Sequence, residues 1–210
     1  MNQRNTFVFN GNTICYAIDF PNGYEEGKVY PTLLYLHGYG FVKATFEDML
    51  LRTPVRRENL PSDQPFVCIT PHCPLDSWVL RMETLCAFCE YIATQSFCDR
   101  KRFYLAGTSM GGCSAWMLLL AKKQLFSASI ICCAQGPYWG AGFYVETPVL
   151  LAHGEKDDVI FAYESKVMAE KVNAVGGNVA LRLYEDLDHG IWETVFKDER
   201  TYAWLLQHTK

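Results

Sequence analysis

A serine flanked by glycines stands at residues 107–111, Gly-Thr-Ser-Met-Gly. The segment lies between an apolar run, 102–106, and a helical pattern, 113–120. The glycines fit a tight strand-to-helix turn in which side chains would collide, and such a turn lifts the serine hydroxyl above a sheet. The alternative is a glycine-rich turn with no nucleophile. Because both flanks have the required pattern, we expect Ser109 to be a nucleophile.

A serine hydroxyl needs a histidine base, and that base needs an orienting carboxylate. In chains with this turn, the order is serine, then acid, then histidine. His189 fits the base because it follows the last strand-like run and precedes the last helical pattern; the alternative is a solvated loop histidine. Asp157 and Asp158 both fit the acid by spacing after the run 149–152. His153 precedes them and is expected to pack at a strand end.

Acyl-transfer chemistry on such a serine also requires backbone N–H groups that bind a developing oxyanion. One donor is expected from Met110, which directly follows the serine. The second is expected from the loop His37-Gly38-Tyr39-Gly40, and we assign it to the N–H group of Tyr39. His37 is expected to brace this loop rather than to transfer protons.

Aromatic residues supply the candidates for a substrate pocket. The segment 137–144 carries several aromatic rings after a strand-like run, and flat aromatic walls suit an acyl chain or an aromatic acid. The alternative is that these rings pack onto their own core. The candidate substrate-binding residues are Trp78, Tyr138, Trp139 and Trp192, and for Trp78 and Trp192 packing in the core is the favoured alternative.

The cysteines indicate neither a metal site nor a disulfide scaffold. All nine are scattered from Cys15 to Cys133, several of them inside apolar runs, and we interpret them as buried reduced thiols. A cytoplasmic location follows from that interpretation. Cys86 and Cys89 have C-x-x-C spacing but lack two further ligands, so we expect no metal and no cofactor.

Composition narrows the class of protein further. Half of the 210 residues are apolar and a fifth are charged, which is typical of a globular chain, and the formal net charge is −4. The absence of a basic stripe argues against a nucleic-acid partner. No apolar run is long enough for a membrane span, and the polar start, 1–6, does not resemble a secretory signal. We expect one domain over 1–210, and nothing in the sequence indicates an oligomeric state.

Short apolar runs alternate with helical patterns, which predicts an α/β fold with a mostly parallel central sheet and helices on both faces. An antiparallel hairpin is expected over 7–19 with Asn10-Gly11 at its turn. We expect the second apolar run to end at Pro71. The expected parallel strands are 32–36, 66–70, 102–106, 129–133, 149–152 and 180–184. The expected helices are 78–92, 113–120, 163–175 and a single last helix from Trp192 to Leu206.

At these residues the chain resembles the α/β-hydrolase superfamily. The resemblance is to its phospholipase/carboxylesterase or predicted-peptidase branch, near dienelactone-hydrolase-like and feruloyl-esterase-like proteins. The segments that carry it are 35–40, 71–74 with Trp78, 104–112, 153–159, 176–179 and 189–192. The resemblance implies an α/β-hydrolase fold, selects Asp157 rather than Asp158 as the acid, and implies that Tyr39 and Met110 frame the oxyanion hole.

These observations lead to one expected function and its alternatives. We expect a serine hydrolase that cleaves a small-molecule carboxylic ester through an acyl-enzyme, with Ser109, His189 and Asp157 as the catalytic residues. A peptidase or a thioesterase would use the same three residues. A ligand-binding module on the same scaffold, without catalysis, is the remaining alternative.

Overall fold

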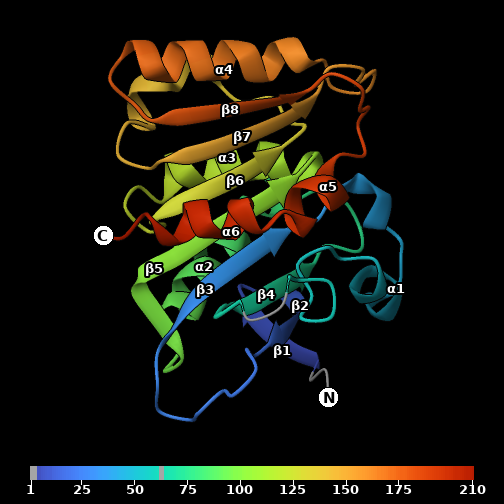
Figure 1. Cartoon of the computed structure of the whole chain (residues 1–210). Coiled ribbons are helices and arrows are strands. Elements are labelled where there is room, and N and C mark those ends of the chain that lie inside the picture. Colours follow the sequence, from blue (N-terminus) through green and yellow to red (C-terminus); the bar gives the residue numbers. More distant parts are fainter. Residues whose placement is uncertain (1–3, 62–63) are drawn as a thin grey trace.

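The computed structural model describes residues 4–61 and 64–210, and its centre is an eight-stranded sheet (Figure 1). The strand order is β1-β2-β4-β3-β5-β6-β7-β8. The last six strands in this order, β4, β3, β5, β6, β7 and β8, are parallel to one another. β1 and β2 form an antiparallel hairpin, and β2 pairs with β4, also antiparallel. The strands are β1 Arg4–Phe9, β2 Asn12–Asp19, β3 Tyr30–Leu36, β4 Val67–His72, β5 Cys98–Thr108, β6 Ala128–Cys132, β7 Val149–Gly154 and β8 Val179–Tyr184.

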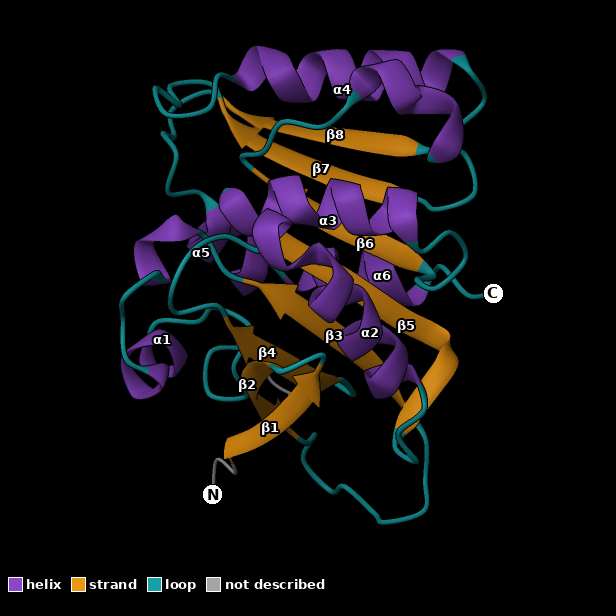
Figure 2. Cartoon of the chain, turned by 180° about the vertical axis from the view of Figure 1, so that it is seen from behind, coloured by secondary structure: helices purple, strands orange, loops and turns teal. Residues whose placement is uncertain are grey.

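Helices cover both faces of the sheet, as the sequence predicted. Figure 2 shows α2, α3 and α4 on one face, whereas α5 and α6 lie on the face toward the viewer in Figure 1. The helices are α1 Phe46–Leu51, α2 Met82–Ala93, α3 Met110–Ala121, α4 Ala162–Ala174, α5 Trp192–Lys197 and α6 Glu199–Leu206. Three short 3₁₀ segments, η1 Tyr39–Phe41, η2 Val79–Arg81 and η3 Tyr138–Phe143, lie in connections.

The core is divided by the sheet into two apolar layers. Successive residues of a strand point to opposite faces, so Leu34 packs in the layer under α2 and α3 while Leu33 packs in the layer under α6. Trp116 of α3 anchors the first layer, and Tyr202 of α6 anchors the second. Because both faces are covered, the central strands are apolar at nearly every position.

The predicted hairpin is confirmed, with positive φ at both Asn10 and Gly11. The expectation that a strand ends at Pro71 is wrong, because β4 continues to His72. Proline lacks an N–H donor and is tolerated where one side of a strand needs none. The ladder to β3 has ended at Ile69, so Pro71 pairs only with β2, opposite Tyr16.

The expected single last helix is also wrong, because Asp198 divides it into α5 and α6. Asp198 has an extended backbone, and its carboxylate accepts a hydrogen bond from the N–H group of Arg200. It therefore begins a new helix as an N-cap rather than continuing the old one. α1 has no counterpart among the predicted helices, because its six residues are too few to show a periodic pattern.

No helix in the described part of the chain is long and apolar enough to cross a bilayer.

Candidate active site

Ser109 occupies the turn between β5 and α3. Its backbone has φ 53° and ψ −120°, a strained combination for a residue with a side chain, and its N–H group donates to the carbonyl of Cys132 at 2.9 Å. The flanking glycines are required by close packing. A Cβ on Gly107 would lie 2.3 Å from the carbonyl oxygen of Gly111, and one on Gly111 would lie 2.0 Å from that of Leu36. The turn therefore holds the serine at the carboxyl end of the sheet.

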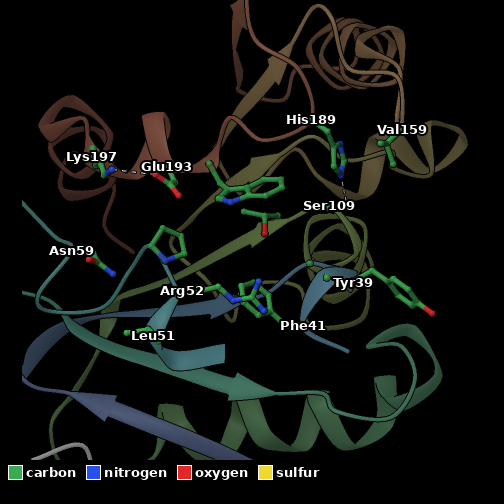
Figure 3. A pocket seen from close by; sticks show the side chains of 15 residues that line it. Tyr39, Phe41, Leu51, Arg52, Asn59, Ser109, Val159, His189, Glu193 and Lys197 are labelled. Carbon is green, nitrogen blue, oxygen red and sulfur yellow. Dashed lines mark hydrogen bonds and ion pairs between the residues drawn. The ribbon is translucent and has the colours of Figure 1, made fainter. Parts of the chain in front are cut away.

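Ser109, His189 and Asp157 form one chain of hydrogen bonds. His189 Nε2 lies 2.9 Å from Ser109 Oγ, and His189 Nδ1 lies 2.7 Å from Asp157 Oδ2. A carboxylate only accepts, so Nδ1 carries the proton and Nε2 is left to accept from the serine hydroxyl. The structure thus brings together the three residues expected to be catalytic, from loops after β5, β7 and β8. Figure 3 shows Ser109 and His189 of this set at the edge of a cavity.

The carboxylate of Asp157 is buried and accepts hydrogen bonds on both oxygens. Oδ1 accepts from the N–H groups of Val159 and Ile160, each at 2.9 Å, and Oδ2 accepts from His189. Burial acts to raise the pKa of Asp157, but the bonds from His189, Ile160 and Val159 outweigh it and leave the pKa below its usual value. The group is therefore an anion next to the imidazole. Asp158 forms none of these contacts.

A second histidine also bonds to the carboxylate of Asp157. His153 is fully buried at the end of β7, and its Nε2 lies 3.0 Å from Asp157 Oδ2 and 2.8 Å from the carbonyl oxygen of Ile160. Both partners are acceptors, so Nε2 carries a proton. Its Nδ1 lies 2.6 Å from Ser165 Oγ on α4. His153 packs at a strand end as expected, and it also donates to the carboxylate, a contact that spacing did not reveal.

The loop after β3 lies beside the serine. The Cβ of Ser109 would lie 3.3 Å from a Cβ on Gly38, and no hydrogen bond among the described residues uses the N–H groups of Tyr39 or Met110. Both N–H groups are therefore free to bind an oxyanion. The side chain of Tyr39 is exposed and points away from Ser109 in Figure 3.

His37 holds this loop in place as a neutral ring. Its Nε2 accepts from the N–H group of Cys73 at 3.0 Å, so Nδ1 carries the proton and donates to the carbonyl of Gly38 at 2.9 Å. Burial lowers the pKa of His37 to about 4, against a smaller opposite effect of the bond to Gly38. The indole of Trp78 donates to the carbonyl of His37 at 3.1 Å.

A cavity of about 650 Å³ opens next to Ser109 and His189. A volume of this size suits a small-molecule ligand. The walls come from the loop after β3, the end of α1, the turn before β4 and α5 (Figure 3). Trp192 lines it, and the ring of Trp192 meets that of His189 edge-on at 5.6 Å between centroids.

The other aromatic candidates lie elsewhere. Trp78 does not line this cavity: its side chain is fully buried in the core, the alternative that the sequence favoured for it, and it braces His37. Tyr138 and Trp139 are exposed and line a second cavity together with Cys113 and Glu164, on the side of α3 and α4. That cavity does not include Ser109.

The described residues contain one group of potential metal ligands, Cys133, His153 and Asp157, whose ligand atoms lie within 4.8 Å of one another. The group is buried, and the ring of His153 and both oxygens of Asp157 are already hydrogen-bonded. Cys86 and Cys89 are buried free thiols on α2.

Comparison with known proteins agrees with this architecture. The sequence pattern of the prolyl oligopeptidase family matches residues 139–210. A thermostable esterase superposes with a TM-score of 0.85 and 23% identity, covering 100% of this chain and 63% of that one. Dipeptidyl peptidase 4 of Porphyromonas gingivalis gives a TM-score of 0.78 at 14% identity, covering 99% and 35%. Est1E from Butyrivibrio proteoclasticus gives 0.74 at 14% identity, covering 97% and 98%.

No curated protein sequence matches the chain. The structural matches show the α/β-hydrolase fold, which confirms the fold that the sequence predicted. The chain spans 63% of the length of the thermostable esterase and 35% of that of the peptidase.

Proposed function

We propose that this chain is a serine hydrolase that cleaves a small-molecule carboxylic ester through an acyl-enzyme intermediate. The observation that carries the proposal is the relay in which Ser109 Oγ, His189 and Asp157 are joined by contacts of 2.9 and 2.7 Å. The α/β-hydrolase fold and the family pattern over 139–210 support the same reaction class.

In the first half of the proposed reaction, Ser109 Oγ attacks the ester carbonyl carbon. His189 Nε2 takes the hydroxyl proton as the new C–O bond forms, and the negatively charged Asp157 stabilises the resulting imidazolium. The carbonyl oxygen becomes an oxyanion, which accepts from the N–H groups of Met110 and Tyr39. When the tetrahedral intermediate collapses, the alcohol leaves with the proton from His189.

In the second half, water replaces the alcohol. His189 Nε2 removes a proton from the water, whose oxygen attacks the acyl carbon, and the same two N–H groups hold the second oxyanion. The C–O bond to Ser109 then breaks, and His189 returns a proton to Oγ. The reaction uses only the side chains and backbone groups described here, so we propose no cofactor.

The decisive variant is Ser109→Ala, because it removes the nucleophile and keeps the turn. We expect it to abolish turnover of short p-nitrophenyl esters while the circular dichroism spectrum stays unchanged. Ser96→Ala, which alters an exposed serine before β5, serves as the matched control and should keep full activity. Normal turnover by the Ser109→Ala protein would refute the assignment.

Peptide cleavage is the second candidate, favoured by the prolyl oligopeptidase pattern over 139–210 and by the dipeptidyl peptidase among the structural matches. A thioesterase would use the same residues. A panel of esters, amides and thioesters with one common acyl group separates these reactions by kcat/KM. We expect the ester to be the best substrate.

A fluorophosphonate probe tests the remaining alternative, a ligand-binding module without catalysis. Such a probe reacts only with an activated serine. We expect labelling of the unmodified protein and none of the Ser109→Ala protein. A chain that binds ligands but resists labelling would belong to that non-catalytic class.

A further inference from the structure

The cavity beside Ser109 is lined by three charged side chains, Arg52, Glu193 and Lys197. Glu193 and Lys197 form an ion pair with each other at 3.1 Å across one turn of α5. Within residues 4–61 and 64–210, no ion pair involves Arg52. The nearby Asp48 instead accepts a hydrogen bond from Thr45 at 2.7 Å. The cavity therefore holds one positive charge that no protein carboxylate balances.

Arg52 is also held in a defined orientation. It follows α1 directly, and its guanidinium carbon lies 4.7 Å from the ring centroid of Phe41. Stacking on an aromatic ring uses the flat face of a guanidinium and leaves its N–H groups free at the edge. Phe41 belongs to the same short segment as Tyr39, so the stack ties Arg52 to the loop proposed to hold the oxyanion (Figure 3).

The surroundings strengthen an interaction with an anion. Leu51, Pro54 and Trp192 line the same cavity and present mainly apolar surface to a ligand. Arg52 is itself exposed, so solvent screens its charge while the cavity is empty. A ligand that fills the cavity against these apolar walls would exclude part of that solvent and strengthen a charge pair. The forked donors of an arginine match the two oxygens of a carboxylate.

We propose that Arg52 binds a carboxylate on the substrate, so that the site favours esters carrying a free carboxylate over neutral esters. This inference rests on the proposed function, because it names the substrate class of the same site. The carboxylate stays intact in the reaction, and Arg52 acts as a specificity-determining residue.

Matched ester pairs test the preference and show which part of the substrate carries the anion. The first pair is p-nitrophenyl butyrate and mono-p-nitrophenyl succinate, which differ by a carboxylate on the acyl side. The second pair is phenyl acetate and 4-carboxyphenyl acetate, which differ on the alcohol side. For at least one pair, we expect kcat/KM to be about tenfold higher for the anionic ester, after correction for the uncatalysed rates.

Substitutions then assign the preference to Arg52. In the Arg52→Gln protein, the anionic-to-neutral ratio of kcat/KM should fall to near one, and Arg52→Lys should keep part of it. Arg100→Gln removes the same charge from an exposed site in β5 and should leave the ratio unchanged. Equal ratios in the unmodified, Arg52→Gln and Arg100→Gln proteins would overturn the inference, as would a ratio near one in the unmodified protein for both pairs.

Equilibrium binding separates failure of this inference from failure of the proposed function. Calorimetry with the Ser109→Ala protein compares each anionic ester with its neutral partner without turnover. About tenfold tighter binding of an anionic ester, lost on adding Arg52→Gln, supports the carboxylate site even if no ester is hydrolysed. Equal binding of both members of each pair overturns it even if esters are hydrolysed.

Discussion

Asp157 is the residue on which the geometry of the site converges. Its carboxylate accepts from two imidazole rings and two backbone N–H groups, and all four donors lie within 3.0 Å. Such a set of donors stabilises the charged carboxylate and fixes its orientation. His153, which does not contact the serine, is therefore one of the donors that hold the carboxylate in place beside His189.

Removing this second imidazole should change the pH dependence of the reaction. In His153→Phe, Asp157 loses a donor to its charged form, so the pKa of Asp157 should rise. Because Asp157 must be an anion to orient His189, the acidic limb of the kcat/KM profile should move to higher pH. We also expect the free energy of unfolding to fall by about 2 kcal/mol, since buried polar partners are left unpaired.

Two further variants distinguish this role from simple packing. His153→Gln keeps an N–H donor near the same position and should restore most of the profile. Ser165→Ala removes the contact to Nδ1 and leaves the contact to Asp157, so the acidic limb should stay in place. A profile that is unchanged in His153→Phe would contradict the argument.

At the scale of the elements, the break between α5 and α6 lets the two helices contact different parts of the molecule. α5 brings Trp192 to the cavity, whereas α6 buries Tyr202 and Leu205 against the sheet. In one continuous helix, the direction of every side chain would be fixed by the same axis, so the two sets could not be oriented independently. Asp198 permits the change of direction because its carboxylate caps α6.

Asp198→Ala should lower the free energy of unfolding by about 1 kcal/mol, the usual effect of removing an N-cap. Glu199→Ala is the matched control, since it removes an exposed carboxylate at the next position without removing the cap. Urea denaturation of the three proteins measures the difference. Equal losses in both variants would show that charge, rather than capping, stabilises this helix.

Much of the fold follows from patterns that are local in the sequence. The apolar runs predicted all the parallel strands to within a few residues, because strands covered on both faces have no polar side. The errors lie where tertiary context decides. Pro71 stays in its strand only because β3 has already ended, and the cap at Asp198 competes with a helical pattern that continues through it.

The site, too, has a part that local sequence patterns predict and a part that depends on tertiary packing. Parallel strands end at one edge of a sheet, so the order serine, acid, histidine was sufficient to predict that Ser109 and His189 meet one of the two aspartates after β7. The family resemblance selected Asp157 from that pair. The walls of the cavity come from α1, α5 and the loop after β3, which are distant in sequence and have no pattern in common. The sequence patterns therefore could not reveal that Arg52 lies in the same cavity as the serine.

At the scale of the whole molecule, the thiols show how completely the core excludes water. All nine cysteines are unpaired, seven are buried, and only Cys15 and Cys113 are partly accessible. Burial raises the pKa of Cys68 to about 12, against smaller effects of nearby charges. The thiolate is the reactive form of a cysteine, so the buried thiols should be inert in the folded chain.

Titration with a thiol reagent such as dithionitrobenzoate at pH 8 should show two reactive groups in the folded protein and nine in denaturant. Cys15 should react first, because burial raises the pKa of the Cys113 thiol and slows its reaction. The Cys15→Ser, Cys113→Ser double variant should lose the rapid phase. Rapid reaction of further thiols would mean that the core opens more readily than the packing indicates.

The loops that hold the acid and the base are bonded to each other. The N–H groups of Glu155 and Lys156 donate to the carbonyls of Tyr184 and Leu187, and Gly154 has no side chain because the backbone of Leu187 lies against it. Backbone bonds between the two loops therefore set the separation of Asp157 and His189. A substitution that displaces either loop should displace both side chains together, so that Nδ1 keeps its partner and the contact of Nε2 with Ser109 is the one that lengthens.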